Sequence, residues 1–253
     1  MMAKLIILGS SNAIPTRDHE NTHLALLSQN RTILIDCVSN PMVRLEQAGI
    51  DPLSITDLIL THFHPDHISG VPLLLMDSWL IGRRAPLNVY GLDYTLERVQ
   101  TMMKLYNWTD WPDFYPVNFR SVAMDEMALV LEADDLRINS TPVRHFLPNI
   151  GLRIELKAEG KSIVYSCDTE PCGEVERLAQ GADVLLHEVA GLFPGHSSAA
   201  QAGAVARQAE VGALYLIHYP TGRFASGDPV AEAKTRFPGD VQLATDFMEI
   251  ELK

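Results

Sequence analysis

The sequence predicts an α/β domain in which two mixed sheets are faced by helices. Short apolar runs, each bounded by turn residues, dominate the 253-residue chain and have the form of β-strands. Helical patterns are interleaved with these runs along the whole length, which is typical of layered α/β folds. No linker rich in Pro, Gly or Ser and no internal repeat separates them, so residues 1–253 are expected to form a single domain.

The N-terminal quarter is expected to contain a strand hairpin and one helix. Its predicted strands are Lys4–Leu8, Thr22–Leu27, Arg31–Ile35 and Asp57–Leu60. The turn at Ser28–Arg31 joins the second and third strands as a hairpin. The helix Pro41–Ala48 ends at Gly49, because glycine readily takes the left-handed conformation that follows a last helical turn.

Strands and helices continue to alternate after this region. Further strands are predicted at Leu87–Tyr90, Ala128–Leu131, Leu136–Thr141, Gly151–Leu156, Ser162–Ser166, Val184–His187, Ala213–His218 and Phe247–Leu252. Further helices are predicted at His67–Leu80, Tyr94–Tyr106, Gly173–Ala179, Ser198–Ala209 and Pro229–Arg236. In the last of these, proline stands in the first turn, where its missing N–H has no intrahelical partner to lose.

The charge balance is acidic, with 20 Lys and Arg against 32 Asp and Glu and a formal net charge of −12. This argues against a broad nucleic-acid-binding surface, because phosphate binding relies on a positive face, although it leaves room for a small basic pocket. Hydrophobic residues make up 47% and charged residues 21%, which excludes a disordered or fibrous protein.

The expected location is the cytoplasm. The apolar run Leu5–Leu8 is too short for a secretory signal and is stopped by Gly9. No run approaches the roughly 20 apolar residues that cross a bilayer, so no membrane partner is expected. The cysteines are odd in number and lack the spacing of a disulfide framework, which favours reduced thiols at Cys37, Cys167 and Cys172.

The motif with the clearest chemistry is a histidine cluster directly after the predicted strand Asp57–Leu60. It reads Thr61-His62-Phe63-His64-Pro65-Asp66-His67. Side chains two residues apart in an extended segment point the same way, so His62 and His64 can reach one ion. Pro65 ends the strand, and the two residues after it begin the next element facing the same cleft. Imidazole and carboxylate donors together favour zinc, with manganese and iron as weaker candidates.

Residues of the same ligand types stand where three later strands end. His145 follows the apolar run that begins at Ile138, Asp168 follows the one that begins at Ile163, and His218 follows the one that begins at Leu214. Each of them taken singly is explained as well by an ordinary capped polar group. Their recurrence at strand ends favours metal ligands.

The order of these motifs resembles that of the metallo-β-lactamase superfamily over most of the chain. The resemblance implies an αββα sandwich of two mixed sheets flanked by helices, with the metals at one edge between the sheets. It also implies two ligand sets that share a bridging residue: His62, His64 and His145 for one metal, Asp66, His67 and His218 for the other, and Asp168 between them.

Two other positions refine this resemblance. Asp36, at the end of the predicted strand Arg31–Ile35, is expected to brace the site and not to bind metal. His64 stands where the di-iron branch of the superfamily carries Glu. The resemblance therefore favours two Zn²⁺ ions in a hydrolytic site, with Mn²⁺ or Fe²⁺ as alternatives.

Two later motifs are similar to those of the ribonuclease Z branch: Leu185-Leu186-His187-Glu188 and Gly195-His196-Ser197-Ser198-Ala199. The resemblance implies that Glu188 orients His196 and that this imidazole assists phosphodiester cleavage. The alternative is that His196 caps the helix that begins near Ser198. His187 faces the other side of its strand from Glu188 and is expected to be structural.

A long basic arm, common in the tRNA-processing enzyme between the third and fourth metal motifs, is missing from that interval. His145 and Asp168 are 23 positions apart, and the predicted hairpin of Gly151–Leu156 and Ser162–Ser166 fills the interval. With the acidic charge, this favours a small-molecule ester, foremost a phosphodiester, as the partner and argues against a large nucleic acid. A homodimer is expected from the resemblance.

The sequence thus predicts a dinuclear zinc hydrolase that cleaves phosphodiester bonds through a hydroxide shared by the metals, with Asp66, Glu188 and His196 as catalytic residues. Three alternatives remain open. They are a tRNA 3′-processing endoribonuclease of the ribonuclease Z type, a lactonase or arylsulfatase using the same site, and a metal-binding regulator without turnover.

Three features are left with two interpretations each. The segment Tyr106–Pro116 holds two Trp, two Tyr and one Phe, and forms either a pocket wall or a packing patch. Arg223 either clamps a substrate oxyanion or lies on the surface. His19 is either a residue of the pocket rim or an ordinary polar residue.

Overall fold

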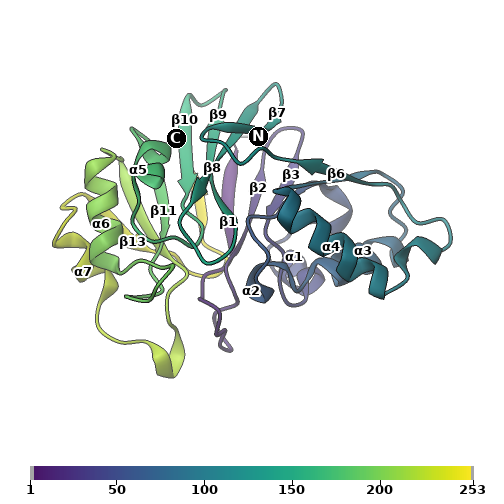
Figure 1. Ribbon diagram of the computed structural model, residues 1–253, viewed down its shortest axis with the longest axis horizontal. Coiled ribbons are helices and arrows are strands. Elements are labelled where there is room, and N and C mark those ends of the chain that lie inside the picture. Colours follow the sequence, from purple (N-terminus) through teal and green to yellow (C-terminus); the bar gives the residue numbers. More distant parts are fainter. Residues whose placement is uncertain (1–2, 252–253) are drawn as a thin grey trace.

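Two seven-stranded sheets pack face to face in the computed structural model, which describes residues 3–251 (Figure 1). Across the first sheet the strands are β14 (Glu249–Glu251), β1 (Lys4–Gly9), β2 (His23–Leu27), β3 (Thr32–Ile35), β4 (Ile55–Ile59), β5 (Leu87–Gly91) and β6 (Val117–Ser121). Across the second they are β13 (Asp240–Leu243), β12 (Ala213–Ile217), β11 (Val184–Glu188), β10 (Lys161–Tyr165), β9 (Asn149–Leu156), β8 (Leu136–Val143) and β7 (Ala128–Glu132).

Helices cover the outer face of each sheet (Figure 1). Those over the first sheet are α1 (Pro41–Gln47), α3 (Val71–Leu80) and α4 (Asp93–Leu105). Those over the second are α5 (Gly173–Ala179), α6 (Ala199–Gln208) and α7 (Pro229–Lys234). Short helical turns complete the chain: α2 (Pro65–Ile68), η1 (Pro52–Ser54), η2 (Trp108–Asp110) and η3 (Gly222–Phe224). The predicted αββα sandwich of two mixed sheets is therefore confirmed.

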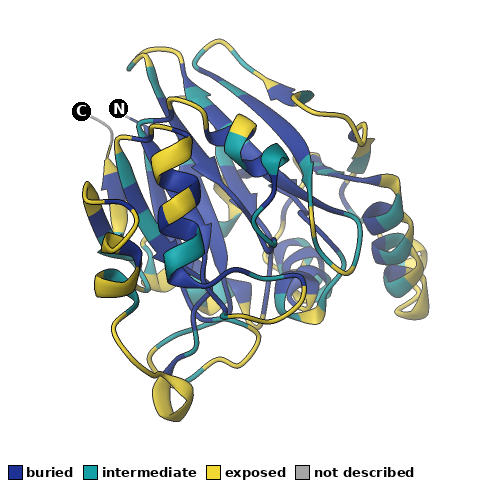
Figure 2. Ribbon diagram, turned by 60° about the vertical axis from the view of Figure 1, so that its left-hand side comes forward, coloured by how far each residue is buried: buried dark blue, intermediate teal, exposed yellow. Residues whose placement is uncertain are grey.

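The alternation of side chains along each strand builds three apolar layers. In β1, Leu5 and Ile7 point into the layer between the sheets, whereas Ile6 and Leu8 pack under the helices of the first sheet. The helices are buried on the side that faces a sheet and exposed on the other, as Figure 2 shows. No helix within the described part of the chain has the length and apolar composition needed to cross a membrane.

The strand directions place the candidate site residues at one edge of the two sheets. Strands β3, β4 and β5 run parallel to one another, and so do β10, β11, β12 and β13. Strand β8 runs the same way as β10, since β9 lies antiparallel between them. The carboxyl ends of parallel strands meet at the same edge of a sheet, and the residues that follow them gather there.

Most predicted elements form near their expected bounds, with one division. The predicted hairpin of β2 and β3 is present as an antiparallel pair. The predicted helix His67–Leu80 is instead two helices, α2 and α3, separated at Ser69 and Gly70. A Cβ atom on Gly70 would lie 2.6 Å from the carbonyl oxygen of Val38, and Pro72 cannot donate to the preceding turn. Of the predicted strand Phe247–Leu252, residue 252 lies outside the described residues.

Candidate metal centre and active site

The candidate ligands follow the carboxyl ends of strands from both sheets. His62 comes after β4, His145 after β8 and Asp168 after β10, while His218 comes directly after β12. The backbone turns sharply just after several of these strands. Asp36, Cys167 and His218 have φ values of 61°, 52° and 56°, a left-handed conformation that is uncommon for residues other than glycine. Such conformations cluster at functional sites, where the surrounding fold maintains them.

One group of donor atoms consists of His62, His64 and His145 together with Asp168. Nδ1 of His64 lies 3.0 Å from Nε2 of His62 and 3.1 Å from Nε2 of His145. Nε2 of His62 is 4.0 Å from a carboxylate oxygen of Asp168. Three imidazole nitrogens and a carboxylate thus converge on one point.

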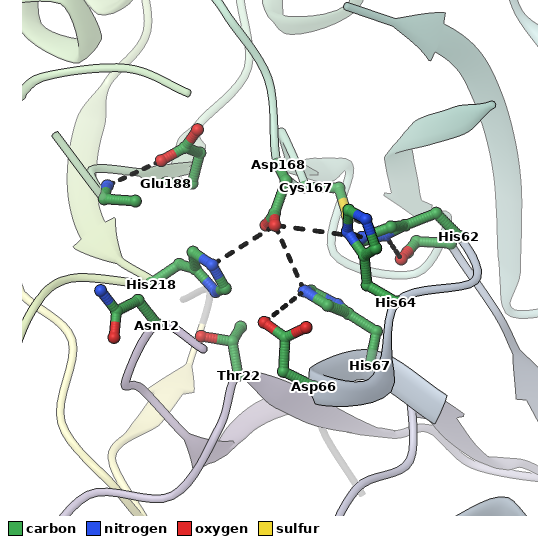
Figure 3. A network of polar contacts seen from close by, with 12 residues as sticks. Asn12, Thr22, His62, His64, Asp66, His67, Cys167, Asp168, Glu188 and His218 are labelled. Carbon is green, nitrogen blue, oxygen red and sulfur yellow. Dashed lines mark hydrogen bonds and ion pairs between the residues drawn. The ribbon is translucent and has the colours of Figure 1, made fainter. Parts of the chain in front are cut away.

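A second group consists of Asp66, His67 and His218, again with Asp168 (Figure 3). Oδ2 of Asp168 lies 3.4 Å from Nε2 of His67 and 3.3 Å from Nε2 of His218. Asp66 approaches the same His67 nitrogen at 3.7 Å. Within each group the donor atoms lie within 4.8 Å of one another, and Asp168 belongs to both. The structure therefore brings together all seven predicted ligands.

Unpaired buried atoms indicate that these groups fit cations. Nε2 of His67 and Oδ1 of Asp168 are buried and have no hydrogen-bond partner. A buried polar atom without a partner costs free energy, and a cation at the centre of each group would provide that partner. Imidazole and carboxylate donors suit Zn²⁺, and Mn²⁺ or Fe²⁺ less strongly.

Hydrogen bonds outside the two groups orient two of their imidazoles, those of His67 and His145. Nδ1 of His67 donates to Asp36 at 2.8 Å, and Asp36 also accepts from the backbone N–H of Thr61 at 2.9 Å. Nδ1 of His145 donates to the carbonyl oxygen of Gly195 at 2.8 Å. Each bond leaves the Nε2 lone pair facing the cluster, as metal binding requires. Asp36 thus lies in the bracing position expected from the sequence, whereas the role of the Gly195 carbonyl was not predicted.

Burial favours the neutral form of several of the candidate ligand histidines. It lowers the pKa of His62, of His145 and of His218, the last to about 4. Desolvation is the main cause, because a buried imidazolium loses its hydration. Neutral imidazole is the form that binds metal ions.

A buried carboxylate holds His196 beside the candidate metal ligands. Glu188 accepts Nδ1 of His196 at 3.1 Å and also the backbone N–H groups of Ala190 and Ser197, at 2.7 and 3.0 Å. Burial raises the pKa of Glu188 to about 7. Burial lowers the pKa of His196, but its bond to Glu188 and the charge of that carboxylate outweigh this effect and raise it. The ring of His196 stacks on that of His218 with a centroid separation of 6.0 Å.

The alternative role of His196 as a helix cap is taken by another residue. Oγ of Ser198 accepts the backbone N–H of Gln201, and the Gln201 side chain accepts the N–H of Ser198, which is a complete capping box for α6. The side chain of His196 is therefore free to serve the site. His187, expected to be structural, is buried and donates Nδ1 to the carbonyl oxygen of Glu188 at 2.8 Å.

A cavity of about 540 Å³ opens onto these residues. Its walls include His64, Asp66, Asp168, His218 and His196, so the Glu188-held imidazole and both donor groups face one space. The remaining lining residues are the polar Asn12 and five small or apolar residues, Ala13, Phe146, Ala190, Phe193 and Pro194.

The aromatic segment Tyr106–Pro116 packs against the body of the protein. Trp111 stacks on Trp79 of α3 with ring centroids 5.3 Å apart, and Trp108 and Phe114 lie against the outer layer of the first sheet. Among the described residues that line the cavity of the metal centre, none comes from this segment. Within the chain, the segment Tyr106–Pro116 is therefore a packing patch and not a wall of this cavity.

The family model of the beta-lactamase superfamily domain matches residues 31–219. The chain belongs to the beta-lactamase superfamily. A curated relative named ribonuclease Z, from Methanothermobacter thermautotrophicus, is 29% identical over an alignment that covers 100% of this chain and 97% of the relative. Ribonuclease Z of Mycobacterium marinum is also 29% identical, with 99% of each chain covered. The predicted likeness to the ribonuclease Z branch of the superfamily is confirmed.

Solved structures of this superfamily support the fold. The metallo-beta-lactamase fold protein YhfI from Bacillus subtilis superposes with a TM-score of 0.84 at 23% identity, covering 99% of this chain and 100% of its own. The short form of human tRNase Z superposes with a TM-score of 0.79 at 22% identity, covering 99% of both chains.

The expected partner was wrong. A small-molecule ester was predicted, and a large nucleic acid was argued against, from the acidic charge and the missing arm. Two curated relatives that match this chain along its whole length are named ribonuclease Z, and one structural neighbour is a tRNase Z. The net charge of −12 is a sum over the whole surface, and it does not report what a small buried cluster of donor atoms binds.

Proposed function

We propose that this protein is a dinuclear zinc endoribonuclease of the ribonuclease Z type, which cleaves a phosphodiester bond in the 3′ part of precursor tRNA. The hydrolysis of phosphodiester bonds is the chemistry that its full-length relatives share. The observation that carries the proposal is the position of His196. Held by Glu188, it lines the same cavity as Asp66, Asp168 and His218.

The two donor groups would each hold one Zn²⁺. The first set of ligands is His62, His64 and His145, and the second is Asp66, His67 and His218, with Asp168 contributing to both. When bound, such ions make water a nucleophile near neutral pH and withdraw charge from a phosphoryl oxygen. Asp66 and Asp168, at the cavity wall, would balance part of the positive charge of these ions.

The chain's own residues would manage the proton of the leaving group. The bond from Nδ1 of His196 to Glu188 leaves Nε2 as the nitrogen that can reach a substrate. From Nε2 a proton passes to the leaving ribose oxygen as its bond to phosphorus breaks, so the departing alkoxide becomes a hydroxyl group. Glu188 keeps the ring in this orientation and stabilises its protonated form.

The test is cleavage of a labelled precursor tRNA with a 3′ trailer by metal-analysed protein. Wild-type protein loaded with Zn²⁺ or Mn²⁺ is expected to release the trailer, and a chelator to abolish the release. His196→Ala is expected to lower kcat by on the order of a hundredfold with unchanged metal content, because one proton donor is lost. Added imidazole should restore part of the rate. His187→Asn, which changes a buried histidine outside the cavity, serves as the control.

Other results would decide between the remaining hypotheses. A protein that binds metal but cleaves no RNA would overturn the proposal and favour a regulator without turnover. Hydrolysis of lactones or sulfate esters that does not depend on His196, without cleavage of RNA, would overturn it in favour of the other hydrolases.

A further inference from the structure

A second cavity adjoins the cavity of the metal centre. Its volume is about 650 Å³, and Ala190 and Phe193 line both spaces. Its other walls come from the loop after β11, the start of α6, the segment that follows His218, α7 and the end of β13, together with His19. The second cavity therefore lies next to the site where the phosphodiester would be cleaved, with Phe193 on their shared wall.

The lining of the second cavity does not suit a phosphate group. Among the described residues that form it there is no Lys or Arg, and Glu232 adds a carboxylate. One oxygen of Glu232 accepts the backbone N–H of Ala200 at 3.1 Å. Ser226 and Thr245 add hydroxyl groups. This combination of an apolar wall, hydroxyl groups, one carboxylate and the imidazole of His19 fits an uncharged group with hydrogen-bonding edges.

Two exposed phenylalanines flank this space. Phe193 is 64% exposed and Phe224 is 44% exposed, although the guanidinium of Arg223 lies 4.8 Å from the ring centroid of Phe224. Large aromatic side chains at the rim of a cavity are typical of binding sites. Nucleobases stack on such rings whatever their sequence, because every base has a π-face.

We propose that the second cavity binds the nucleobase of a ribonucleotide next to the cleaved phosphate, with Phe193 and Phe224 as stacking rings. This inference rests on the proposed function and adds a base-binding subsite to it. It also accounts for how an acidic protein holds RNA. Affinity that other proteins obtain from Lys and Arg contacts to phosphates would come here from stacking and from the metal centre.

The test pairs a change in the RNA with a change in the protein. RNA substrates are compared that are identical except for one nucleotide without a base, on the 5′ or on the 3′ side of the cleaved bond. In wild-type protein, loss of the base on one side is expected to raise KM about tenfold. Phe224→Ala should raise KM for the intact RNA to a similar extent and remove the difference between intact and abasic RNA. Phe224→Tyr should restore it, since tyrosine retains a stacking ring.

Leu192→Ala is the control, because Leu192 is a 78% exposed apolar residue beside Phe193 in the loop after β11 and lines neither of the two cavities. It should behave as the wild type. Two results with a wild type that cleaves RNA would refute the base-binding subsite and leave the proposed function standing. One is that abasic nucleotides on both sides of the cleaved bond leave KM unchanged. The other is that the change in the RNA and the change in the protein act independently on KM. If the wild type cleaves no RNA with any metal, the proposed function itself fails.

Discussion

At the scale of single residues, hydrogen bonds decide which nitrogen of His67 and of His145 faces the candidate metal centre. Asp36 accepts the Nδ1 proton of His67, and the carbonyl oxygen of Gly195 accepts that of His145. An ionised carboxylate can only accept, whereas an amide can also donate. The identity of Asp36 therefore controls the tautomer of His67, and through it the availability of one donor to a cation.

Replacing Asp36 by asparagine should weaken metal binding by about 10- to 100-fold, because the amide can present its N–H to His67 Nδ1 and shift the proton to Nε2. Competition with a chelating dye measures the affinity. Asp57→Asn is the matched control. Asp57 is a buried carboxylate of the same sheet that accepts from Arg31 and Asn88, and its loss should lower stability without changing metal affinity. Equal metal affinity in both variants would contradict the bracing role.

His187 gives a prediction on pH. Burial lowers its pKa from 6.5 to about 4, partly offset by its bond to the Glu188 carbonyl oxygen. Between about pH 4 and pH 6.5 the unfolded chain binds a proton at this residue that the folded chain does not. The contribution of neutral His187 to the free energy of unfolding is therefore fully present above pH 6.5 and is lost as the pH falls. From pH 8 to pH 5 the wild type should lose about 2 kcal/mol more free energy of unfolding than His187→Asn does.

Denaturant titrations of both proteins at the two pH values measure this difference. Asparagine can keep a donor near the Glu188 carbonyl oxygen but does not titrate, so any constant cost of the substitution cancels in the comparison. Parallel curves for the two proteins would refute the assignment of acid sensitivity to His187.

At the scale of elements, the missed strands share a place in the fold. Val117–Ser121 and Asp240–Leu243 form β6 and β13, each at an edge of its sheet. Most of their residues are partly buried or exposed, with Val241 buried, so neither shows the continuous apolar run of the central strands. Their place depends on neighbouring strands that are distant in sequence. The hairpin of β2 and β3 was predictable because its turn and pairing are local.

The division between α2 and α3 carries a prediction. Gly70→Ala should destabilise the protein by about 1–3 kcal/mol and weaken metal binding, because the new Cβ would meet the backbone of Val38 and displace the turn that holds His67. Gly173→Ala is the control. Its new Cβ would meet only the end of the exposed Arg177 side chain, and alanine favours the helix that begins there. Thermal unfolding and metal content measure both effects, and equal behaviour of the two variants would contradict the argument.

At the scale of the whole molecule, the site exists only where the two sheets meet. The segment after β4 of the first sheet supplies His62 to His67, and strands of the second sheet supply Asp168 and His218. Residue type and strand-end position were enough to single out these candidate ligands, whereas their division into two sets was taken from the family resemblance. The cavities were beyond prediction, because distant residues such as His19 and Thr245 share one wall, and nothing in their local sequence links them. The same limit explains the partner error, since net charge carries no information on where charges lie.

The charge distribution leads to a prediction on salt. The protein carries a net charge of −12, and no Lys or Arg is found among the described residues lining either cavity of the active-site region. Each phosphate neutralised by a basic side chain contributes about −0.7 to the slope of log affinity against log salt for single-stranded RNA. We therefore expect kcat/KM for RNA to fall with a slope no steeper than about −2, the value for two to three such contacts. The measurement uses a fixed metal concentration and a salt that does not bind the metals. A slope steeper than about −4 would show that basic residues outside the cavities hold the RNA. Stacking would then not be the main source of the affinity for RNA.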